Sequence, residues 1–237
     1  MLETLSALVA MIQVGIQAGL AVIGTAGSSA LQAEGLQGLD LIALAPPTAG
    51  YECQAPVWET EPQAKPGAKG LYQAAMKTQC KLYPSLGGDF KRLQDFSLEQ
   101  LKVRGQILTG PIEEIHDSLP SLFVHYKLPI KTKKVEVTMW QDIHLATDGA
   151  QRFVSETAST KIEGKGMAEY LKRADVKIEI HAGAVAGEHE ATVEFYSEME
   201  KPWYAPESIL ISKLKELVPT QFAEVRDQFM SEASKNY

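Results

Sequence analysis

The sequence predicts an α+β protein in which a long apolar N-terminal helix precedes an antiparallel sheet packed against a C-terminal amphipathic helix. Three observations lead to this fold class. No charged residue lies between Thr4 and Ala33. Apolar residues then alternate with polar ones along most of residues 122–199, which is the period of half-buried strands. After Pro206 the spacing becomes helical, with one apolar stripe along the last segment.

The length of 237 residues suits a single substantial core rather than two full domains. We expect three parts along the chain. These are an apolar anchoring or assembly helix over residues 1–34, a Gly- and Pro-rich connection over 35–70, and an α+β globular domain over 71–237.

The first element is the apolar segment from Leu5 to Gly24. A helix of roughly 20 residues is long enough to span the hydrocarbon of a bilayer. A removable signal peptide would need a positive region ahead of the apolar run, and the only side-chain charge there is Glu3. A membrane anchor, a helix in an assembly and a helix buried against the domain all remain open at this stage.

The second element is the connection, which we expect to be an irregular loop from Tyr51 to Gly70. It contains Cys53, which together with Cys80 makes up the two cysteines of the chain. A disulfide between them would close a loop that the chain-entropy model values at roughly 3 to 4 kcal/mol, and it would persist in an oxidising compartment. The alternative is a pair of buried free thiols in a cytosolic protein.

The globular domain begins with one or two short helices over residues 89–108, with Asp89 as the N-cap. Strands joined in an antiparallel meander follow. The strand segments are 122–130, 135–145, 151–163, 175–182 and 191–199. The last element is the amphipathic helix after Pro206, in which Pro219 predicts a kink or a break.

Charge and motifs argue against several function classes. Six acidic residues precede Lys65, the first basic one, and account for six of the seven net negative charges, so the rest of the chain is nearly neutral. No basic surface for a phosphate backbone is indicated, which argues against nucleic acid as a partner. The histidines lack metal-ligand spacing, and neither a phosphate loop nor a nucleophile elbow is present. We expect no metal, no cofactor and no enzymatic activity.

The stretch Met1-Leu2-Glu3-Thr4-Leu5-Ser6-Ala7-Leu8-Val9, followed by an uncharged segment, resembles the mature N-termini of type IV pilins and Tad-type pseudopilins. The resemblance implies that Glu3 neutralises a neighbouring subunit's amine inside a filament. Small residues Gly15 and Gly19 would allow close helix approach, and Gln13 and Gln17 could hydrogen-bond across helices. An ordinary membrane anchor or a helix buried against the domain is the competing interpretation.

Residues 122–230, a run of strands that ends in TVEFYSEMEKPWYAPESILISKLKELV, resemble the helix-grip domains of the START and polyketide-cyclase superfamily. The resemblance implies a curved sheet that grips the C-terminal helix around an apolar cavity. Candidate residues for lining such a cavity are Phe123, Met139, Trp140, Phe153, Phe195, Trp203 and Leu214.

The leading functional hypothesis from the sequence is an exported, non-enzymatic structural subunit whose N-terminal helix anchors it in a membrane or assembles it into a filament with copies of itself. It would work in the cell envelope or outside the cell. The alternative hypothesis is a helix-grip carrier for a lipid or another hydrophobic ligand. A cavity between sheet and helix would favour the carrier.

Overall fold

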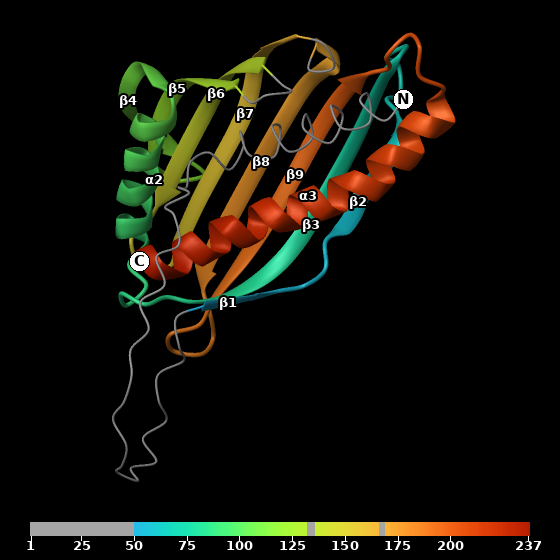
Figure 1. Ribbon diagram of the computed structural model, residues 1–237. Helices are drawn as coiled ribbons and strands as arrows, with labels where there is room; N and C mark the ends of the chain where they lie inside the picture. Colours follow the sequence, from blue (N-terminus) through green and yellow to red (C-terminus); the bar gives the residue numbers. More distant parts are fainter. Residues whose placement is uncertain (1–49, 132–135, 166–168) are drawn as a thin grey trace, which may run out of the picture.

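A computed structural model describes residues 50–131, 136–165 and 169–237 (Figure 1). These residues form one nine-stranded antiparallel sheet with the helices α2 (Phe90–Arg104) and α3 (Glu207–Asn236). The strands are β1 (Gly50–Cys53), β2 (Val57–Ala64), β3 (Leu71–Tyr83), β4 (Gln106–His116), β5 (Leu119–Lys131), β6 (Glu136–Thr147), β7 (Arg152–Gly164), β8 (Leu171–Ala182) and β9 (His189–Glu200).

The strand order β1-β3-β9-β8-β7-β6-β5-β4 contains an uninterrupted meander from β4 to β9, and β2 also pairs with β3. Strand β3 joins the meander beside its last strand, β9. The chain then reaches the opposite edge, at β4, through α2. This connection places α2 at one side of the sheet, while α3 crosses the same face from the other side (Figure 1).

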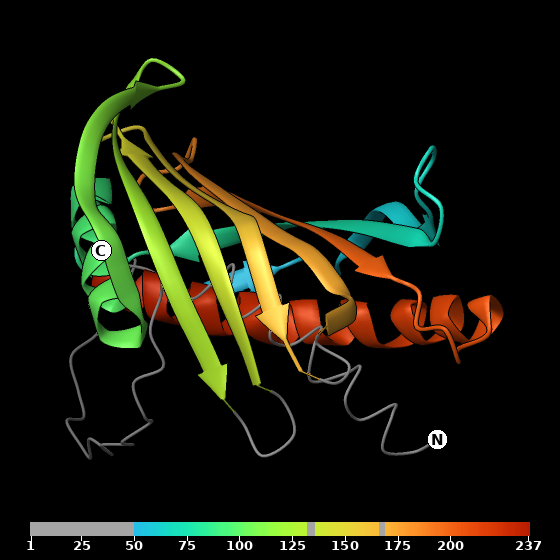
Figure 2. The same cartoon turned by 90° about the horizontal axis from the view of Figure 1, so that it is seen from above.

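The two helices lie on the same side of a strongly twisted sheet, and α3 runs across it (Figure 2). We call the side that carries the helices the inner face and the other side the outer face. Alternation along the strands divides the residues between these faces, as β6 shows with Met139 and Ile143 buried and Trp140 and His144 partly exposed.

The fold class inferred from the sequence needs a correction. The fold that the structure describes opens with strands β1 and β2 and is mostly sheet, so a long apolar helix does not lead it. The helix predicted over residues 5–24 lies outside the described residues. Among the described ranges, no helix combines the length and the hydropathy needed to cross a bilayer. A run of apolar residues shows that a segment avoids water, but lipid, filament and protein core all satisfy that requirement.

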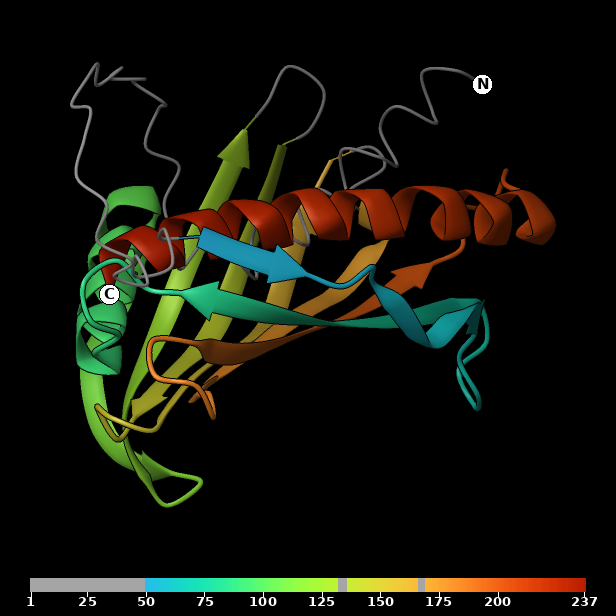
Figure 3. The same ribbon diagram turned by 90° about the horizontal axis from the view of Figure 1, so that it is seen from below.

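The irregular loop predicted over residues 51–70 is also wrong in part, because β1 and β2 both pair with β3 there. These strands lie beside α3 (Figure 3). Proline and polar residues in this stretch suggested a loop, but an edge strand tolerates both. Register shifts along β2 accommodate the irregular sequence.

The helices follow their local sequence signals with one exception. Asp89 caps α2 as predicted, because its carboxylate accepts a hydrogen bond from the Lys91 amide. Helix α3, however, is continuous through Pro219, so of the predicted kink or break the break does not occur. Val218 and Phe222 are both buried on either side of the proline, and this packing keeps the segment helical despite the missing amide hydrogen.

Candidate functional site

The inner face of the sheet is a continuous buried surface. One row of directly paired residues crosses it from β5 to β3 and consists of Val124, Ile143, Thr157, Val176, Phe195 and Met76. The neighbouring row consists of Leu122, Leu145, Ser155, Ile178, Val193 and Thr78. Most of these side chains are apolar, so the face would bind water poorly and suits apolar partners.

The two helices approach this face from opposite sides. The backbone of α3 runs close to β1, β2 and β3, whereas α2 lies against β4, β6 and β7. Large side chains of α3 reach further across the sheet, as the stacked rings of Phe195 and Phe222 show with centroids 6.2 Å apart. The inner face is therefore framed by a helix at each side.

Polar atoms on this apolar face have no hydrogen-bond partner among the described residues. They are the hydroxyl of Tyr126, both amide atoms of Gln141 and the hydroxyl of Thr157. All three side chains are buried, with exposed fractions of 0%, 1% and 2%. Gln221 adds a fifth such atom, its amide oxygen, from the buried stripe of α3.

The strand register brings the three sheet residues together. Tyr126 lies directly opposite Gln141, while Thr157 lies opposite Ile143 and is a diagonal neighbour of Gln141. Side chains in such positions are separated by about 5 to 8 Å at Cβ. Burial raises the pKa of the Tyr126 phenol to about 12, although nearby Arg104 acts in the opposite direction. The phenol therefore keeps its proton at neutral pH and can donate a hydrogen bond.

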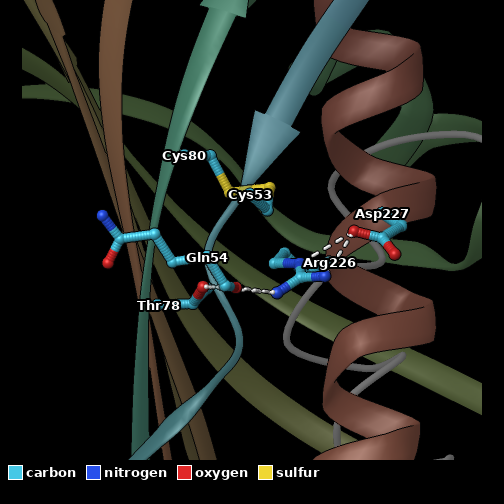
Figure 4. Close-up of a disulfide and its surroundings, with 6 residues drawn as sticks. All are labelled: Cys53, Gln54, Thr78, Cys80, Arg226 and Asp227. Atoms are coloured by element: carbon cyan, nitrogen blue, oxygen red, sulfur yellow. Dashed lines mark hydrogen bonds and ion pairs between the residues drawn. A yellow bond between two sulfur atoms is a disulfide. The ribbon is translucent and has the colours of Figure 1, made fainter.

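Beside this face, a disulfide joins β1 to β3 (Figure 4). Cys53 and Cys80 are directly paired in the antiparallel register, so the predicted disulfide is confirmed. Strand β1 has only four residues, and the covalent bond attaches it to the long strand β3. Because α3 packs on β1, the disulfide also stabilises the platform on which the helix lies.

Arg226 of α3 reinforces the same region (Figure 4). Its guanidinium donates a hydrogen bond of 2.8 Å to the Gln54 carbonyl, which also accepts one of 2.9 Å from the Thr78 hydroxyl. Asp227 accepts a further 2.8 Å bond from the Arg226 side chain. A buried cation is tolerated when it is paired and hydrogen-bonded in this way, so Arg226 ties α3 to the corner between β1 and β2.

A crevice of about 590 Å³ opens at one end of the inner face. It lies between the start of α2, the β4–β5 hairpin and the turn after β6. Its lining mixes Ile115 and Leu122 with the polar residues Lys91, Gln94 and Glu113. The crevice therefore offers a partly apolar opening next to the buried surface.

The outer face has the opposite character. A row of paired residues crosses it from β5 to β3 and consists of Phe123, His144, Glu156, Lys177, Glu194 and Lys77. Neighbours in this row form ion pairs, at 2.7 Å for Lys177 with Glu156 and 2.6 Å for Lys77 with Glu194. Partly exposed ion pairs of this kind are typical of a solvated surface.

The structure divides the candidate cavity residues into two groups. Met139, Phe153, Phe195 and Leu214 are buried between the sheet and the helices. The other three cannot line a space there, and their assignment is corrected. Phe123 and Trp140 lie on the outer face, with Phe123 between two histidine rings and Trp140 under Lys127 and Lys161. Trp203, in the loop before α3, is 85% exposed.

The residues proposed for assembly, Glu3, Gln13, Gly15, Gln17 and Gly19, lie outside the described residues. In the part of the chain that is described, no group of histidine, cysteine and carboxylate side chains could hold a metal ion.

Sequence reasoning missed Tyr126, Gln141 and Thr157. A signal for Gln141 was present, because it interrupts the inward-facing series Met139, Ile143, Leu145 with a polar residue. A glutamine at an inward position of an otherwise apolar strand face indicates either a buried network or a binding group.

No family model matches the chain, and no curated protein matches it in sequence. Solved structures that show a likeness to the chain include a START superfamily protein from Mycobacterium smegmatis, with 10% identity, a TM-score of 0.36 and coverage of 65% of this chain and 94% of that one. A STAR-related lipid transfer protein fragment from Xanthomonas axonopodis has 8% identity, a TM-score of 0.32 and coverage of 75% and 99%. Human STARD10 has 11% identity, a TM-score of 0.28 and coverage of 73% and 75%.

Proposed function

We propose that this chain is a non-enzymatic carrier that binds a lipid or another hydrophobic ligand on the inner face of its sheet. The observation that carries the proposal is the buried apolar inner face framed by α2 on one side and α3 on the other. Pockets for hydrophobic ligands are mostly apolar and contain a few polar groups, and this face has that composition.

Two further features support a carrier. The crevice beside Ile115 and Leu122 offers a route by which a ligand could reach the inner face. The disulfide and Arg226 hold the β1 side of the structure together, so α3 could keep its place while a ligand enters or leaves. A carrier benefits from a rigid frame of this kind. When the site already has its binding conformation, fewer groups have to become ordered as the ligand binds, and less affinity is lost.

We also propose that the protein works in an oxidising compartment outside the cytosol. The Cys53–Cys80 disulfide supports this location, because glutathione and thioredoxin keep most cytosolic thiols reduced. Alkylation of the protein isolated from its own host would test it. Freely alkylated cysteines in the native material would contradict export.

Binding is tested with the full chain and a neutral apolar fluorescent probe, N-phenyl-1-naphthylamine. We expect saturable binding that Met139→Trp weakens by about tenfold or more, because the larger ring occupies space on the inner face. Thr138→Trp places the same ring on the outer face and should leave probe binding unchanged. Circular dichroism checks the folding of both variants.

Equal probe binding by both variants would place the probe elsewhere and contradict the proposal. A Met139→Trp chain that no longer folds would show that protein atoms already fill the inner face, and would contradict it as well. Native mass spectrometry of the protein from its own host supplies the complementary measurement. A co-purifying apolar molecule is the expected result.

A further inference from the structure

The unpartnered polar atoms of the sheet's inner face belong to neighbouring residues. Tyr126, Gln141 and Thr157 lie on the adjacent strands β5, β6 and β7 and are direct or diagonal neighbours. Native proteins leave few buried polar atoms unsatisfied, because each loses its hydrogen bonds to water without replacement. Four such atoms on neighbouring residues of one apolar surface therefore need an explanation.

We propose that Tyr126, Gln141 and Thr157 form a polar subsite that binds the uncharged hydroxyl or carbonyl group of an amphiphilic ligand. The inference rests on the proposed carrier function and specifies the ligand class. The apolar part of the ligand would lie against neighbouring inner-face residues such as Met139 and Ile143, which are fully buried.

The chemistry of the three side chains suits a neutral group. Gln141 offers both a donor and an acceptor, Tyr126 offers a proton, and Thr157 can either donate or accept. A ligand hydroxyl can donate to the Gln141 carbonyl oxygen and accept from its amide or from Tyr126. A carbonyl can accept from the same donors.

A carboxylate fits the subsite less well. An ionised carboxylate only accepts hydrogen bonds and would meet the Gln141 oxygen as a repulsive neighbour. It would also lose its hydration in an apolar environment, which is costly without a paired cation. Arg104 acts electrostatically on Tyr126 and is the cation that could offset this cost, so a carboxylate belongs in the test as a competitor.

The test measures displacement of N-phenyl-1-naphthylamine from the full chain by 1-decanol, decanoate and decane. We expect wild-type protein to bind decanol more tightly than decane. Gln141→Met should weaken decanol binding by about tenfold, and Thr157→Val by a smaller factor, with decane unchanged. The outer-face substitutions Gln79→Met and Thr192→Val are matched controls and should change neither affinity.

Thermal unfolding shows whether the variants remain folded. The inner-face variants should unfold at the same or a higher temperature when no ligand is present, because each loses an unpartnered polar atom. A stable variant that has lost its preference for decanol would therefore separate ligand recognition from folding.

The possible outcomes distinguish the subsite from the carrier function. A wild-type protein that binds the probe but shows equal competition by decanol and decane would overturn the subsite and leave the carrier intact. That result would also indicate that ordered water satisfies the cluster. If both the wild type and Gln141→Met bind decanoate more tightly than decanol, the proposed subsite is likewise overturned. A wild-type protein that binds no probe would contradict the carrier function itself.

Discussion

The two faces of the sheet are formed by the same strands but differ in polarity. On β6, Met139 and Ile143 turn inward and are fully buried, while Asp142 and His144 turn outward and form ion pairs with His125 and Glu114. On the outer face, charged side chains lie in ion pairs, as His125 and Asp142 do at 2.7 Å. The buried outer-face nitrogens of His116, His144 and Arg152 that make no hydrogen bond belong to side chains that each contact a carboxylate. On the inner face, Tyr126, Gln141 and Thr157 have polar atoms without a hydrogen-bond partner among the described residues.

Under the proposed carrier function, this difference separates the residues that stabilise the fold from those that bind the ligand. Outer-face ion pairs lie in a high dielectric and contribute little each, whereas buried apolar side chains supply most of the stabilisation. Unpartnered polar atoms are expensive where water is excluded. In the subsite proposed above, the inner face retains them for a ligand rather than for folding.

The largest expected difference between the faces comes from removing one phenylalanine side chain from each of them. Phe153→Ala on the inner face should lower the free energy of unfolding by about 3 to 5 kcal/mol, since Phe153 is fully buried. Phe123→Ala on the outer face should lower it by about 1 kcal/mol or less, because the ring is partly exposed. Chemical denaturation measures both. Similar losses would show that the two faces do not differ as described.

The next largest effect concerns the disulfide that supports the α3 side of the inner face. Replacing Cys53 and Cys80 together with alanine should lower the free energy of unfolding by roughly 3 to 4 kcal/mol in the chain-entropy model. The measurement is denaturant unfolding, with the wild-type chain in reducing buffer as a second condition. An unchanged midpoint in both conditions would show that hydrogen bonds and packing alone hold β1 on β3.

A smaller effect of opposite sign is expected for the polar cluster. Thr157→Val should raise the free energy of unfolding of the ligand-free protein by about 1 kcal/mol, because it removes a buried hydroxyl that has no partner. Thr192→Val, on the outer face, should change it by less than about 0.5 kcal/mol. A clear loss of stability for Thr157→Val would mean that ordered water or another group satisfies the hydroxyl.

Periodicity in the sequence was enough to predict the meander. The alternating segments between residues 122 and 199 lie in β5 to β9, and the apolar stripe after Pro206 lies in α3. These signals are local, because a strand with one buried face has an apolar residue at every second position, whichever strands it pairs with. The cysteine pair was equally readable, since two cysteines allow one intramolecular disulfide.

The parts that failed depend on distant partners. Strands β1 and β2 exist because β3 lies beside them. The predicted disulfide placed Cys53 near Cys80, but the prolines and polar residues of this stretch did not indicate that its backbone pairs with β3. Phe123 and Trp140 were placed in a cavity because they are aromatic, whereas their position in the alternation puts them on the outer face. The same alternation puts Gln141 on the inner face. A residue's place in the strand alternation therefore predicted the site better than its residue type did.

The smallest expected effect tests the outer face through pH. Burial alone would raise the pKa of the Glu179 carboxyl, but the hydrogen bond from His181 and the nearby charges of Arg152 and Lys177 outweigh it and hold this pKa below its usual range. A lowered pKa in the folded state stabilises the protein above the unfolded pKa of about 4.3, and this contribution disappears as the pH falls through the folded pKa.

Glu179→Gln should therefore lower the free energy of unfolding by less than about 1 kcal/mol at pH 7, and the difference from wild type should shrink as the pH falls below about 4. It should also shrink in 1 M salt, because exposed ion pairs are screened. Glu190→Gln, at an exposed position of the same face, is the matched control and should have a smaller effect. A large, salt-independent loss for Glu179→Gln would mean that the outer face stabilises the fold as the inner face does, and the contrast between the two faces would be lost.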